Sequence, residues 1–179
     1  MPLSRYRHIV VEGPIGVGKT SLAKKLAEHL QAELLLENAA DNPFLPRFYQ
    51  DPKRYALATQ LHFLFDRARQ ISQLAQGDLF RHSMVSDFLL DKDRLFARLN
   101  LDDDEYTLYR KIFDDLALQA PAPDLVIYLQ APLDKLKARV KRRGIDYEQG
   151  MSADYLDRLA ATYSEFFHRY DAAPVLMVN

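Results

Sequence analysis

The most constraining feature of the chain is a glycine-rich segment at residues 13–20, which reads G-P-I-G-V-G-K-T. The pattern G-x-x-x-x-G-K-[ST] is typical of a loop whose backbone N–H groups bind a polyphosphate. Glycines let the backbone approach the phosphates closely, where a Cβ would interfere. The Lys19 side chain can reach the β- and γ-phosphates, and the Thr20 hydroxyl can bind Mg²⁺. We therefore predict a phosphate site formed by Gly13, Pro14, Ile15, Gly16, Val17, Gly18, Lys19, Thr20 and Ser21.

The residues on both sides of this segment support that interpretation. Residues 8–11 are an apolar run that fits a buried strand, and residues 20–30 have helical periodicity with Leu22, Leu26 and Leu30 on one side. The phosphates would therefore meet the N-terminus of a helix, where the helix dipole favours anions.

Apolar runs alternate with helical stretches along the whole chain. This alternation predicts a doubly wound α/β fold, with a parallel sheet and helices on both of its faces. In such a sheet the loops that follow the strands form the site. Glu37 and Asp87 each end an apolar run, so we expect both near the phosphate loop. The five expected strands are residues 8–11, 33–36, 84–86, 125–129 and 175–178.

Two helix starts can also be identified. Asp51 and Pro52 resemble an N-cap followed by proline at the first helical position, and the helix is expected to reach about residue 74. Gln60 and Arg67 are seven residues apart and share a face of this helix. The acidic run 102–105 suits the start of another helix, and a metal site there is the less favoured alternative.

Length and composition set further bounds. We expect a single domain over residues 1–179, because that length can bury a core. A hydrophobic content of 48%, a charged content of 27% and a net charge of −1 favour a globular protein that binds neither nucleic-acid polymers nor membranes. The chain has no cysteine, which fits a cytoplasmic location.

The stretch from Glu37 through N-P-F-L (42–45) and F-Y-Q-D-P (48–52) to Gln60 and Arg67 resembles the deoxynucleoside kinase family. The resemblance runs from about residue 8 to residue 178 and includes the bacterial deoxyadenosine, deoxyguanosine and deoxycytidine kinase branch of the family. It implies a P-loop kinase that transfers the γ-phosphoryl group of ATP, with Mg²⁺, to the 5′-hydroxyl of a deoxynucleoside. It also implies a homodimer.

The resemblance assigns the residues around the nucleoside. It implies that Glu37 is the base that takes the proton of the 5′-hydroxyl, that Gln60 binds the edge of the base, and that Arg67 and Asp93 favour bases with amino groups. The alternatives are a solvated acid for Glu37, an exposed glutamine for Gln60 and a surface ion pair for Arg67 and Asp93. Phe96 is expected either to stack on the base or to belong to the core.

The same resemblance assigns residues that bind the sugar and residues that form a lid. Tyr49 would bind the 3′-hydroxyl together with Glu148, and Asp87 would help to bind Mg²⁺. The lid spans about residues 139–150, where Arg139 and Arg143 are one helical turn apart and can bind one phosphate group together. The alternative is that these cations only complement the C-terminus of a helix.

The chain departs from the family pattern at several positions. Where the family has arginine after the acid that follows strand three, this chain has Phe88, and a further lid arginine is Ile145. We expect Arg142, Arg143 or Arg94 to supply the missing charge, and the alternative is a slow enzyme. Family members also commonly continue beyond the last strand, whereas this sequence stops at Asn179.

Two other functions remain open from the sequence. A nucleotide-binding regulatory or scaffold protein would fit Phe88, although such a protein would need none of Glu37, Gln60, Tyr49 and Glu148. A nucleoside monophosphate kinase would need more cations for the acceptor phosphate than residues 37–67 offer, so we rank it low.

Overall fold

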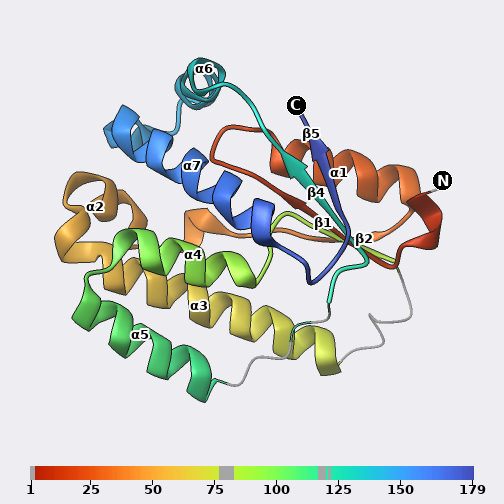
Figure 1. Cartoon of the computed structure of the whole chain (residues 1–179), viewed down its shortest axis with the longest axis horizontal. Helices are drawn as coiled ribbons and strands as arrows, with labels where there is room; N and C mark the ends of the chain where they lie inside the picture. The colour runs from red at the N-terminus through yellow and green to blue at the C-terminus, as the bar shows by residue number, and fades with distance from the viewer. Residues whose placement is uncertain (1–2, 77–82, 117–119, 121) are drawn as a thin grey trace.

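The apolar runs of the sequence form a parallel sheet in a computed structural model that describes residues 3–76, 83–116, 120 and 122–179. The strands are β1 (His8–Glu12), β2 (Glu33–Leu35), β3 (Met84–Ser86), β4 (Leu125–Leu129) and β5 (Val175–Val178). Their order is β2-β3-β1-β4-β5, and every pairing is parallel (Figure 1). The predicted doubly wound α/β fold is therefore confirmed.

The strand β1 lies in the middle of the sheet. His8 is level with Met84 of β3, and Ile9 is level with Leu125 of β4. Val10 of β1 and Val126 of β4 are fully buried because helices cover both faces of the sheet at this point. Continuous apolar runs are typical of parallel strands buried in this way.

Helices pack on the sheet in two layers (Figure 1). The helices α1 and α6 share an apolar cluster with Ile9 and Val11 on one face, and α4 and α7 pack against Val10 on the other. The helices are α1 (Lys19–Leu30), α2 (Leu45–Gln50), α3 (Pro52–Gln76), α4 (Asp91–Asn100), α5 (Asp103–Asp115), α6 (Leu133–Arg143) and α7 (Ala153–Arg169). Short 3-10 helices are η1 (Leu3–Arg5), η2 (Ala39–Asp41) and η4 (Asp146–Gly150).

The acidic run at residues 102–105 begins α5, as expected. The Asp102 side chain accepts a hydrogen bond from the backbone N–H of Glu105, and the Glu105 side chain accepts one from the backbone N–H of Asp102. This capping box satisfies N–H groups that a helix start leaves unpaired. Within the described part of the chain, no helix is both long and apolar enough to cross a membrane.

Two glycines let the phosphate loop sit close to its neighbours. A Cβ on Gly13 would lie 2.4 Å from the backbone oxygen of Leu129, at the end of β4, and the φ of Gly13 is +151°. A Cβ on Gly16 would lie 3.0 Å from the backbone oxygen of Leu136 in α6, at a φ of +84°. Only glycine adopts these backbone conformations without strain in so little space.

Gly13→Ala should destabilise the fold and weaken nucleotide binding, because the new methyl group would collide with a backbone atom. We expect a loss of about 2 kcal/mol or more, which lowers Tm by roughly 4–8 °C. Gly150→Ala is the matched control, since its Cβ would lie 3.5 Å from the nearest atom, an ordinary contact. Thermal unfolding of both variants checks this, and equal Tm values would contradict the crowding at Gly13.

Candidate active site

The ends of three neighbouring strands are tied together by Asp87, which follows β3. One carboxylate oxygen of Asp87 accepts a hydrogen bond from the Thr20 hydroxyl at 2.5 Å. The other accepts the backbone N–H of Glu37 at 2.7 Å. The phosphate loop after β1, the segment after β2 and the turn after β3 thus meet at one edge of the sheet, as the parallel topology requires.

The cations of the phosphate loop are bound to backbone carbonyl groups. Lys19 Nζ donates to the oxygens of Gly13 at 2.7 Å and Pro14 at 3.3 Å. Arg139 Nη1, from α6, donates to the oxygen of Val17 at 3.0 Å. Burial, and after it the charge of Lys92, lowers the pKa of Lys19. These side chains are therefore held at the loop, with donors that can turn to phosphate oxygens.

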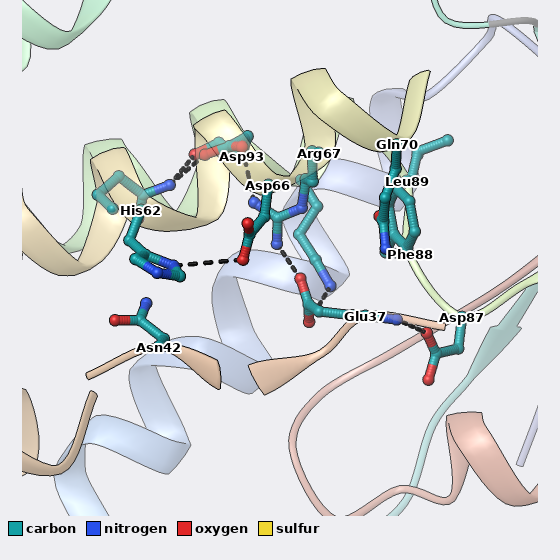
Figure 2. A network of polar contacts seen from close by, with 12 residues as sticks. Glu37, Asn42, His62, Asp66, Arg67, Gln70, Asp87, Phe88, Leu89 and Asp93 are labelled. Carbon is teal, nitrogen blue, oxygen red and sulfur yellow. Dashed lines mark hydrogen bonds and ion pairs between the residues drawn. The ribbon is translucent and has the colours of Figure 1, made fainter. Parts of the chain in front are cut away.

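A buried polar network links the segment after β2 to α3 and α4 (Figure 2). Arg67 donates through Nη1 to Asp93 Oδ2 at 2.6 Å and through Nη2 to Glu37 Oε1. Gln60 Nε2 donates to the backbone oxygen of Asp93 at 3.0 Å and also to its carboxylate. Tyr109 donates to the same carboxylate at 3.2 Å.

Burial decides between the alternatives for these residues. Gln60 is 4% exposed, Arg67 5% and Asp93 0%. An exposed helix glutamine and a surface ion pair are therefore both ruled out. Glu37 retains more contact with solvent, and together with Phe63 and Arg67 it lines a cavity of about 170 Å³.

The charges around Glu37 set its protonation. Burial alone would raise the pKa of this carboxyl, but Arg67 and Lys92 lower it to about 2. Glu37 is therefore ionised near neutral pH, the state in which a carboxylate can accept a proton. In return, Asp93 and Glu37 raise the pKa of Arg67 against the opposing effect of burial.

The lid segment packs on α2. The rings of Tyr49 and Tyr147 stack with centroids 6.2 Å apart and an interplanar angle of 7°. Burial, then Tyr155 and Glu148, raises the pKa of Tyr49. Glu148 is 8% exposed and accepts a hydrogen bond from Arg143 Nε at 3.1 Å. The structure thus places Tyr49 and Glu148 close together and pairs Arg143 with Glu148.

The aromatic residues divide between the site and the core. The ring of Phe96 meets the ring of Tyr163 edge to face at 6.0 Å, within the cluster beneath α7, which favours the core alternative for Phe96. Phe88 is 6% exposed, and its ring centroid lies 6.0 Å from the Arg67 guanidinium carbon.

Of the three arginines expected to compensate for Phe88, Arg94 pairs with an acid of α5 and Arg143 pairs with Glu148. Arg94 is half exposed on α4, and its Nη2 lies 3.6 Å from Asp114 Oδ1 of α5. Besides Arg67, the cation that contacts Glu37 is Lys92, whose Nζ lies 3.1 Å from Glu37 Oε2. Sequence reasoning missed Lys92 and also Glu12, its second partner at 3.5 Å. The signal in the sequence was a lysine in the first turn of a helix, where the dipole disfavours a cation.

The strand, phosphate loop and helix, with a carboxylate network at the same sheet edge, define a P-loop kinase. The profile of the deoxynucleoside kinase family matches residues 9–179. A deoxyadenosine kinase of Lactobacillus acidophilus is 35% identical over 96% of this chain and 84% of that protein. A deoxyadenosine/deoxycytidine kinase of Bacillus subtilis is 30% identical over 96% of this chain and 81% of that protein.

The solved structures agree. A deoxyadenosine kinase from M. mycoides, solved with the products dCMP and a flexible dCDP, superposes with a TM-score of 0.85 at 25% identity, covering 96% of this chain and 90% of that one. The chain belongs to the deoxynucleoside kinase family. It is an enzyme that transfers the γ-phosphoryl group of ATP to the 5′-hydroxyl of a deoxynucleoside. The regulatory or scaffold alternative is not favoured.

Arg67→Met should cost about 3 kcal/mol or more of unfolding free energy at neutral pH, because it leaves the buried Asp93 without its cation and removes one of the two cations beside Glu37. Arg98→Met is the matched control on α4. Arg98 and Asp103 form an exposed pair at 3.1 Å, and such pairs contribute about 0–1 kcal/mol. Urea denaturation of the variants measures both costs, and equal small costs would contradict the buried network.

The cost of Arg67→Met should also depend on pH. The pKa of Glu37 is lowered in the folded protein from 4.5 to about 2. The stabilisation from its ion pairs is therefore complete above about pH 4.5 and is lost as the pH falls through about 2. The difference between the wild type and Arg67→Met should shrink over that range.

Proposed function

We propose that the enzyme phosphorylates deoxyadenosine, deoxycytidine or deoxyguanosine, with Glu37 as the general base. The observation that carries this proposal is the continuous buried network from Gln60 through Asp93 and Arg67 to Glu37. One end offers an amide, a carboxylate and a guanidinium for the edge of a base with an amino group. The other end offers a carboxylate for the 5′-hydroxyl.

The phosphate donor would bind at the loop between β1 and α1. Backbone N–H groups of the loop and the N-terminus of α1 suit the phosphates of ATP. Lys19 and Arg139 would exchange the carbonyl oxygens of the loop for phosphate oxygens. These are charge-assisted hydrogen bonds and hence stronger than those to carbonyl groups.

Thr20 and Asp87 would hold Mg²⁺. Their side-chain oxygens are 2.5 Å apart, and Mg²⁺ prefers hydroxyl, carboxylate and phosphate oxygens. The residues present therefore fit this ion, which supplies positive charge against the β- and γ-phosphates. Asp87 would also keep its hydrogen bond to the backbone of Glu37, which links the donor site to the base.

Transfer of the phosphoryl group needs positioning and charge compensation more than covalent chemistry. Glu37 would orient the 5′-hydroxyl and take its proton as the 5′-oxygen bonds to the γ-phosphorus. The bond between the γ-phosphorus and the bridging oxygen breaks, and its electron pair leaves with ADP. Arg139 and Arg143 of the lid would neutralise charge on the phosphates.

The sugar would bind between α2 and the lid. Tyr49 and Glu148 would hydrogen-bond the 3′-hydroxyl, and the stacking of Tyr147 on Tyr49 would fix that ring. In the structure Arg143 donates a hydrogen bond to Glu148. Movement of Arg143 to a phosphate would release Glu148 for the sugar.

We also propose a cytoplasmic homodimer. The absence of cysteine suits a reducing compartment. Leu95 and Leu99 of α4 and Phe166 of α7 line an open groove on the outer surface, and helix packing between two copies there would cover it.

Glu37→Gln should lower kcat by roughly 10²-fold or more, because an amide cannot accept the proton of the 5′-hydroxyl. The KM for the nucleoside should change less. Glu28→Gln makes the same change at an exposed position of α1 and serves as the control. Steady-state assays of ADP release measure both variants, and a near-normal kcat for folded Glu37→Gln would exclude this role.

Among the four deoxynucleosides, thymidine should give the lowest kcat/KM. Its base has no exocyclic amino group, so buried polar groups of Gln60, Arg67 or Asp93 would be left unpaired. The assay compares kcat/KM for all four deoxynucleosides, with ribonucleosides and monophosphates as further arms. Thymidine as the best substrate would overturn the proposed base preference, and phosphorylation of monophosphates alone would overturn the proposed acceptor.

A further inference from the structure

Lys92 is a buried lysine at an unfavourable place in its helix. It lies in the first turn of α4 and is 4% exposed. Lysines are almost never buried so fully unless they are paired, and the N-terminus of a helix disfavours a cation. Its position therefore needs a compensating interaction, which two carboxylates provide.

Glu12 at the end of β1 and Glu37 in the segment after β2 compensate the charge of Lys92. The Lys92 Nζ lies 3.1 Å from Glu37 Oε2 and 3.5 Å from Glu12 Oε1. Burial opposes the charged form, but Glu12 and Glu37 raise the pKa of Lys92 above its usual value. Lys92 is therefore a protonated ammonium group in contact with the carboxylate that faces the 5′-hydroxyl.

Glu12 fixes this ammonium group relative to the phosphate loop. It is 0% exposed and accepts hydrogen bonds from the backbone N–H groups of Gly13 at 3.0 Å and Leu89 at 2.9 Å. It also accepts one from the Tyr163 hydroxyl at 3.1 Å. One carboxylate thus holds the first residue of the loop, the turn after β3 and the Lys92 side chain in one arrangement.

Lys92 is also linked to Lys19 through Glu12. Lys19 Nζ donates to the backbone oxygen of Gly13 at 2.7 Å, and the backbone N–H of Gly13 donates to Glu12, the second partner of Lys92. Both cations are therefore held where the phosphate loop begins. A 5′-hydroxyl bonded to Glu37 Oε2 would lie about 2.7 Å from that oxygen. It would hence lie within about 6 Å of Lys92 Nζ, which is 3.1 Å from the same oxygen.

We propose that Lys92 is the catalytic cation that stabilises the negative charge developing between the 5′-oxygen and the transferring γ-phosphoryl group. It acts from α4, whereas the turn after β3 carries the buried apolar side chain of Phe88. Lys92 keeps its proton throughout, while the 5′-hydroxyl proton passes to Glu37 and ADP leaves with the electron pair of the broken bond. This role rests on the proposed function of Glu37.

The first test compares Lys92→Met and Lys92→Arg by single-turnover phosphoryl transfer at saturating Mg-ATP and deoxynucleoside. Lys92→Met should lower the rate by roughly 10²- to 10³-fold, the usual effect of removing such a group. The KM values should change less than about fivefold, because the charge acts mainly in the transition state. Lys92→Arg keeps the charge and should stay within about tenfold of the wild-type rate. Lys111→Met, at an exposed position of α5, is the control.

The second test separates catalysis from folding. Lys92→Met leaves Glu12 buried without its cation, so the variant could lose activity through instability. In Lys92→Met/Glu12→Gln the buried charge is removed together with its partner. We expect this double variant to regain thermal stability but to remain at least about tenfold slower than Glu12→Gln alone.

Several results would overturn the proposed role of Lys92 but leave the proposed function of the enzyme intact. They are a near wild-type rate for folded Lys92→Met, a Lys92→Arg variant no faster than Lys92→Met, and a double variant as fast as Glu12→Gln. A wild-type enzyme that phosphorylates no deoxynucleoside would instead overturn the proposed function, and the role of Lys92 with it.

Discussion

The structure depends above all on the burial of one guanidinium group between two carboxylates. Arg67 of α3 binds Asp93 of α4 and Glu37 after β2, and its own exposure is 5%. A buried charge without partners would cost several kcal/mol, so these three segments must fold together. The same contacts hold Gln60 and Asp93, which we propose for the base, in fixed relation to Glu37, which we propose for the 5′-hydroxyl, so one network would serve both folding and recognition.

The strands were largely predictable because their signal is local. For three strands, the bounds predicted from continuous apolar runs are the bounds that the structure has: residues 84–86, 125–129 and 175–178. The first strand extends one residue further than predicted, to Glu12, because an acid ends an apolar run in the sequence. In the structure that acid is buried and belongs to the sheet, since donors from distant segments satisfy it.

The proximity of Glu37, Gln60 and Arg67 was predictable, because Glu37 follows a strand and the other two share a helix face. Lys92 was missed because its partners come from residues far away in the sequence, and a lysine in a polar helix start is usually exposed. Arg143 and Glu148 are only five residues apart in the sequence and pair in the structure. Even so, nothing in the sequence showed whether Arg143 would contact a phosphate or this acid.

The hydrogen bonds of Lys19 and Arg139 to loop carbonyl groups have a consequence for ligand selection. Both cations are already ordered at the loop, so a ligand need not immobilise them and loses less entropy on binding. It must, however, compete with acceptors that are already in place. A neutral molecule would replace these bonds with others of similar strength and gain little, whereas a polyanion gains the difference between a carbonyl and a charged oxygen. The loop would thus select polyanions over neutral molecules, because a ligand must compete with the carbonyl oxygens of the loop for the two cations. This selection would not depend on any contact to the nucleotide base.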